Sequence, residues 1–237
     1  MKNLFPHTVL KMLFIFLLML FFKIDCFPQD VISPCSFDQN FSLNVKDSFK
    51  NEFGINKTIP VDIEKYCLVA LSKYPALKDV TIIFRYRNIS TTMSALPKGI
   101  RLNRDKRKYV ININKRPSKK GTARFSLLST NAKIGLIAHE LGHILYYTNR
   151  SNIQLVWDGF RYMIPRHHRE IEYLADEAAI AAGFGLQLYE FNNYLLNEAK
   201  IGKKYRRKKM EYYYSLQDLQ DLIEDSYEIS FQDFYTP

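Results

Sequence analysis

The 237-residue chain contains few of the residues that mark a non-globular protein. It has three cysteines, nine glycines and nine prolines. Three cysteines in a chain of this length cannot replace a core, which excludes a disulfide scaffold. The scarcity of glycine and proline excludes collagen-like and low-complexity classes. Hydrophobic residues make up 47% of the chain and charged residues 24%, so the composition predicts a folded protein with a core of its own.

The N-terminus has a long apolar run, but one too short to span a bilayer. Residues 12–22 carry no polar side chain, and Lys2 and Lys11 precede them. As a helix, this run would reach about 16 Å against a hydrocarbon core of about 30 Å. The pattern predicts a secretory signal peptide over residues 1–26, and hence export to a periplasmic or extracellular location. An uncleaved membrane anchor is the alternative, because Lys23 ends the run and no small-x-small cleavage site follows.

Export would place the two cysteines beyond residue 26 in an oxidising compartment. Cys35 and Cys67 would then be able to form a disulfide. Two unpaired cysteines, with Cys67 in a helix core, are an equal alternative.

Positive charge dominates the chain. Lysine and arginine number 34 against 24 acidic residues, which gives a net charge of +10. Much of the excess lies in the runs 101–108, 115–124 and 203–209. These runs favour solvated faces or contact with an anionic surface such as lipid or polysaccharide, and nucleic acid is an improbable partner for an exported protein.

The mature part, residues 27–237, shows no internal repeat and no linker, which predicts a single domain. An amphipathic helix is expected between Pro60 and Pro75, and β-branched and aromatic residues predict strands over 80–86 and 109–113. Helices are expected near 132–148, 153–163, 167–182, 185–199 and 216–225. A small N-terminal sheet followed by a helical C-terminal half gives the α+β class.

One motif in helix 132–148 carries chemistry. His139-Glu140-Leu141-Gly142-His143 places two imidazoles at i and i+4, on one face of the helix, where both can bind one cation. Glu140 lies one position round the helix and is free to act as a general base on a metal-activated water that attacks a carbonyl. The alternative is that the two histidines bind no metal and find hydrogen-bond partners within the protein or in solvent. That alternative is costly because apolar residues surround the motif: Ile134, Leu136, Ile137, Leu141, Ile144 and Leu145.

A catalytic zinc ion has three protein ligands as a rule, so a third residue is required. Glu172 and Asp176 stand at i and i+4 on the helix expected over 167–182, with small alanines around them that permit close helix approach. Glu172 can serve as the ligand, and Asp176 can accept the second ring N–H of a motif histidine.

These paired motifs resemble those of the gluzincin zinc metallopeptidases, whose H-E-x-x-H helix is followed by an E-x-x-x-D helix. The resemblance covers about 45 residues, 135–179, and the short remainder suggests a minimal version. It implies His139, His143 and Glu172 as ligands of one zinc ion, Glu140 as general base and acid, and Asp176 as the partner of a ligand histidine. The implied activity is zinc-dependent endopeptidase cleavage of protein or peptide substrates.

No motif in the sequence identifies the residues for two further roles, the strand that aligns the substrate and the donor to the oxyanion. In such enzymes an edge strand before the motif helix aligns the substrate, and the strand over 109–113 occupies that place, with an ordinary interior strand as the alternative. Its residues are Tyr109, Val110, Ile111, Asn112 and Ile113. The candidates for the oxyanion donor are His167, His168, Tyr162 and Tyr173. Since no donor is assigned, the alternative function is a catalytically silent, peptidase-like module that binds zinc or a partner at the cell envelope.

Overall fold

The computed structural model describes residues 47–99, 103–115 and 122–235. They all belong to one compact unit, Ser36–Pro237. The expected signal peptide or anchor and Cys35 lie outside the described residues. Cys67 is buried and forms no disulfide within the described part of the chain. None of the helices in that part combines the length and the apolar character needed to cross a bilayer.

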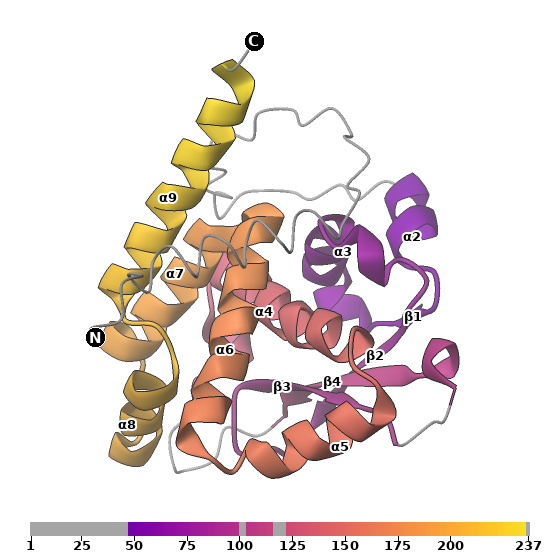
Figure 1. Cartoon of the computed structure of the whole chain (residues 1–237), viewed down its shortest axis with the longest axis horizontal. Coiled ribbons are helices and arrows are strands. Elements are labelled where there is room, and N and C mark those ends of the chain that lie inside the picture. Colours follow the sequence, from indigo (N-terminus) through magenta and orange to yellow (C-terminus); the bar gives the residue numbers. More distant parts are fainter. Residues whose placement is uncertain (1–46, 100–102, 116–121, 236–237) are drawn as a thin grey trace, which may run out of the picture. The chain divides into compact units, whose positions relative to one another are not determined.

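A four-stranded mixed sheet forms one side of the fold (Figure 1). Its strands are β1 (Lys57–Thr58), β2 (Thr81–Arg87), β3 (Met93–Pro97) and β4 (Lys108–Asn114), in the order β1-β2-β4-β3. The pairs β1/β2 and β2/β4 are parallel, and β3 runs antiparallel to β4. Alternate β-branched and aromatic residues on β2 and β4, such as Ile82, Phe84, Ile111 and Ile113, fill the core.

The sheet order corrects one expectation. The strand over 109–113 is expected from the sequence at the edge of the sheet, but β4 lies in its interior and pairs with both β2 and β3. The edge strand next to the motif helix is β3, which pairs with β4 alone among the described strands. β3 lacks β-branched residues and ends at Pro97, a residue that strands tolerate at edges. Because of this composition, no local pattern in the sequence indicates a strand there.

Helices make up the rest, which confirms the α+β class (Figure 1). The helices are α2 (Asp47–Phe53), α3 (Glu64–Ser72), α4 (Thr130–Thr148), α5 (Asn152–Arg161), α6 (Pro165–Ala179), α7 (Gly185–Asn193), α8 (Lys203–Tyr212) and α9 (Leu216–Tyr235). α2 and α8 lie where the sequence predicted no helix, and α9 extends ten residues beyond the expected 225.

The motif helix α4 is the centre of the fold. Ser129 caps its N-terminus by accepting a hydrogen bond from the Ala132 N–H at 3.0 Å. Its faces pack against α3, α6, α7 and β3, so most of the helix is buried. The close packing of α4 on α6 and β3 is what allows residues from three elements to meet at the motif.

Gly142 sets the distance between α4 and α6. A Cβ atom at this position would lie 2.7 Å from the Ala175 carbonyl oxygen, which is closer than van der Waals contact allows. We expect Gly142→Ala to push the two helices apart and to lower the free energy of unfolding by about 1–3 kcal/mol in urea titrations. Gly159→Ala is the matched control, because a Cβ there meets nothing within 4 Å. The control should be neutral or stabilising by about 0.5–1 kcal/mol. Equal stability of both variants would show that the helix contact is not tight.

Candidate metal centre

The structure brings together the three residues expected to bind a metal. His139 and His143 project from α4, and Glu172 projects from α6, with their ligand atoms within 4.8 Å of one another. Glu172 Oε2 lies 3.3 Å from His139 Nε2 and 3.4 Å from His143 Nε2. All three side chains are buried. This group can hold a metal ion.

The donor set fits a zinc ion. Ligand atoms about 2.0–2.1 Å from a tetrahedral zinc ion are about 3.3 Å apart, close to the separation of Glu172 from each ring nitrogen. The same carboxylate oxygen, Oε2, is buried, faces both ring nitrogens and lacks a hydrogen bond of good geometry within the described residues. A cation held between this oxygen and the two imidazoles would satisfy these buried polar atoms.

Asp176 orients one of the two imidazoles. His139 Nδ1 donates a hydrogen bond to Asp176 Oδ1 at 2.7 Å, and Asp176 is 0% exposed. Burial opposes the charged form of His139, but the charge of Asp176 and the contact with Glu172 together raise the pKa of His139 to about 10. The contact fixes the proton on Nδ1 and turns Nε2 toward Glu172.

Replacing the Asp176 carboxylate by an amide tests this orientation. We expect Asp176→Asn to weaken zinc binding by about 10–100-fold, because the amide keeps the hydrogen-bond acceptor but loses the charge that makes the imidazole a better ligand. Competition with a chromophoric chelator measures the change. Glu170→Gln, a substitution at an exposed position of α6, is the control and should bind zinc as the unmodified chain does. Unchanged affinity in Asp176→Asn would contradict the orienting role.

Glu140 is buried next to His139 on α4 but does not belong to the group of three residues that could hold a metal ion. One oxygen of its carboxylate, Oε2, has no hydrogen-bond partner in the described part of the chain, while the backbone N–H of Ala95 on β3 donates to the group. Burial raises the pKa of Glu140, against the opposing effect of His143 and His139. A carboxyl group held in this state is suited to exchange protons in catalysis.

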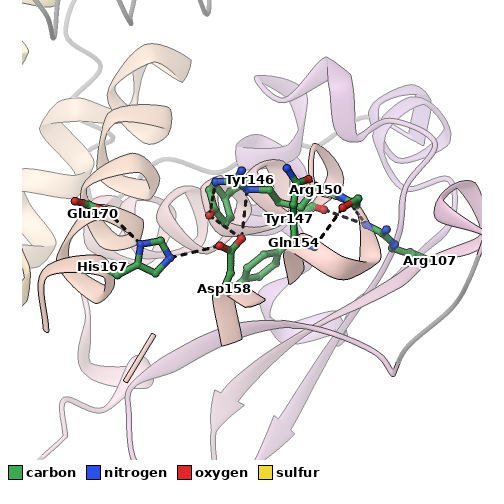
Figure 2. Close-up of polar contacts among 9 residues, drawn as sticks. Arg107, Tyr146, Tyr147, Arg150, Gln154, Asp158, His167 and Glu170 are labelled. Atoms are coloured by element: carbon green, nitrogen blue, oxygen red, sulfur yellow. Dashed lines mark hydrogen bonds and ion pairs between the residues drawn. The ribbon is translucent and has the colours of Figure 1, made fainter. Parts of the chain in front are cut away.

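Two of the four candidates for the oxyanion donor contact Glu172, a member of the metal-binding group. Tyr162 Oη donates to Glu172 Oε1 at 2.9 Å, and His168 Nε2 lies 3.1 Å from the same oxygen. The other two are engaged elsewhere. His167 lies between Asp158 at 3.4 Å and Glu170 at 3.2 Å, as Figure 2 shows. Tyr173 stacks on Tyr214 at 3.7 Å between ring centroids. Of the four candidates, Tyr162 and His168 are therefore the two that contact the metal-binding group.

The structure adds two residues that sequence reasoning missed. The Tyr213 ring lies 5.9 Å from the His139 ring, and the Lys209 ammonium lies 3.0 Å from the centroid of the Tyr213 ring. Burial lowers the pKa of Lys209 to about 8, against the opposing charges of Asp176, Glu172 and Glu140. Tyr205, Lys209 and Tyr213 are spaced four apart, a helical signal that was hidden by the surrounding basic residues.

Comparison of the chain with protein-family models, with curated proteins and with solved structures gave no match.

Proposed function

We propose that this protein is a zinc-dependent endopeptidase. The observation that carries the proposal is a buried His139, His143 and Glu172 group with a buried carboxylate, Glu140, next to it that is not needed as a ligand. A purely structural zinc site has four protein ligands as a rule, whereas three ligands and an adjacent acid or base are typical of a hydrolytic site.

Bound zinc would polarise the carbonyl of the scissile bond and lower the pKa of a water to about 7. The chain's own part is proton transfer. Glu140 accepts a proton from the attacking water and returns it to the leaving amine nitrogen. Burial, which raises the pKa of Glu140, suits it to both roles because the group must hold the proton between the two steps. We propose Tyr162 and His168, which both contact Glu172 beside the site, as the donors of a hydrogen bond to the developing oxyanion.

Strand β3 is the surface on which we propose that a peptide aligns. Thr92 C=O and Lys98 N–H bond to β4, so by antiparallel alternation the backbone groups of Met93 and Ala95 face away from β4. The donation from the Ala95 N–H to Glu140 agrees with this direction. An extended peptide that pairs with this edge would run beside the catalytic carboxylate.

Peptide cleavage by the purified chain tests the proposal. We expect the chain to cleave an unfolded protein, to lose cleavage with a zinc chelator, and to regain it when zinc is added back. Elemental analysis should find one zinc ion per chain. One bound zinc ion without any cleavage would refute the peptidase and favour the catalytically silent, zinc-binding module instead.

A further inference from the structure

Helix α5 exposes its apolar face. Apolar residues recur along it at i, i+3, i+4 and i+7 and continue into the turn that follows. All are exposed, by between 45% and 85% of their surface. We call this surface the α5 stripe; it comprises Ile153, Val156, Trp157, Phe160, Met163 and Ile164. In an ordinary surface helix, such a face packs on the core.

The one buried residue of α5 is polar. Asp158, 8% exposed, accepts a hydrogen bond from Tyr146 Oη at 2.9 Å and pairs with Arg150 at 3.3 Å (Figure 2). His167 reaches the other oxygen of Asp158 at 3.4 Å. This network ties α5 to both α4 and α6. Because this network holds Asp158 inward, the α5 stripe on the opposite side of the helix faces outward.

Positive charge accompanies the α5 stripe. Arg161, Arg166 and Arg169 are exposed, whereas Asp158 is buried and Glu170 is paired with Arg166 at 3.2 Å. The basic helix α8 is attached nearby. Arg169 Nε donates to the Glu211 carbonyl at 3.0 Å, and the rings of His168 and Tyr212 stack at 4.2 Å. The α5 stripe therefore lies in a basic part of the surface.

We propose that the α5 stripe is a peripheral membrane-binding surface that enters the interface of a bilayer containing anionic lipid. An exposed helix face rich in tryptophan, phenylalanine and isoleucine and flanked by arginine is typical of interfacial helices. The arginines complement lipid phosphate groups, and each basic residue near an anionic surface adds about fivefold to partitioning. Since Tyr162 ends α5 and contacts Glu172, this docking places the candidate metal centre close to the bilayer surface.

Trp157 reports on this surface because it is the only tryptophan in the chain. The full chain is mixed with phosphatidylcholine vesicles that contain phosphatidylglycerol and a brominated lipid. We expect the Trp157 emission to shift to shorter wavelength and to be quenched by the bromine. Ile153→Ser combined with Phe160→Ser should weaken the partitioning seen by Trp157 at least about 10-fold. Val61→Ser combined with Leu127→Ser is the control, since these residues are 87% and 62% exposed outside the α5 stripe, and it should behave as the unmodified chain does.

Charge variants and a lipid-free control distinguish membrane binding by the α5 stripe from contact at another surface. Arg161→Gln combined with Arg166→Gln should weaken partitioning to anionic vesicles about 25-fold, at about fivefold for each residue, and leave partitioning to neutral vesicles unaffected. Vesicle binding without any change in Trp157 emission would place the contact elsewhere, such as residues 12–22, and overturn the proposal. An emission shift that follows protein concentration without lipid would identify a second copy as the occupant and would also overturn it. Urea unfolding confirms that each variant keeps the fold.

Discussion

Glu140→Gln is expected to lower kcat/KM for peptide cleavage by about 10²–10⁴-fold while one zinc ion per chain stays bound. The amide keeps the size of the side chain and can still accept the hydrogen bond from the Ala95 N–H. It cannot take up a proton, so the water loses its base and the leaving amine loses its acid. The ligands His139, His143 and Glu172 are untouched, which is why metal content should not change.

Parallel measurement of zinc and activity makes this test specific. Glu198→Gln, an exposed position outside the site, is the matched control and should keep full activity. A Glu140→Gln chain that cleaves at the original rate would show that another group is the base. Loss of both zinc and activity would mean that Glu140 supports the metal and would leave its proton-transfer role without support.

Local periodicity predicted the centre of the site. His139 and His143 meet because a helix brings i and i+4 together, whatever the rest of the chain does. Glu172 and Asp176 obey the same rule on α6. What joins the two helices is a tertiary contact, and Gly142, inside the motif, is the residue that permits it. The sequence thus contained both halves of the metal centre and the small residue between them.

Local sequence patterns do not by themselves determine the order of the strands in the sheet. β3 and β4 resemble each other little in composition, and the choice between edge and interior depends on pairings between distant segments. The hydrophobic and β-branched character of β4 marks it as buried on both sides, as interior strands commonly are. The expectation that the strand over 109–113 lies at the edge was therefore wrong, and the alternative of an interior strand is the one that the sheet order supports.

Buried charge was the second source of error. Lys209 belongs to a basic run that suggested a solvated face, yet its side chain is buried, with the ammonium over the rings of Tyr213 and Phe191. Asp158 is the converse case, since one buried carboxylate decides which face of α5 is turned inward. Periodicity predicts that a helix has an apolar and a polar face. Which face is buried depends here on single polar residues, Lys209 in α8 and Asp158 in α5.

Glu172→Ala is expected to remove stoichiometric zinc. The substitution leaves two imidazoles without the only anionic ligand, so affinity should fall by more than the roughly 10–100-fold that loss of an orienting group such as Asp176 costs. Glu172→Gln offers a neutral oxygen in the same place and should bind zinc with intermediate affinity. Metal analysis after gel filtration, together with chelator competition, ranks the zinc affinities of the unmodified chain, Glu172→Gln and Glu172→Ala.

Zinc-dependent stability gives a second readout for the same substitution. Zinc at about 100 times its Kd should raise the free energy of unfolding of the unmodified chain by about 2.7 kcal/mol, because only the folded chain presents the assembled site. Glu172→Ala should show no such gain, and the exposed control Glu170→Ala should show all of it. Zinc that stabilises Glu172→Ala as much as the unmodified chain would mean that the ion binds through other residues. In that case His139, His143 and Glu172 would not be the metal centre, and the peptidase proposal would fall with them.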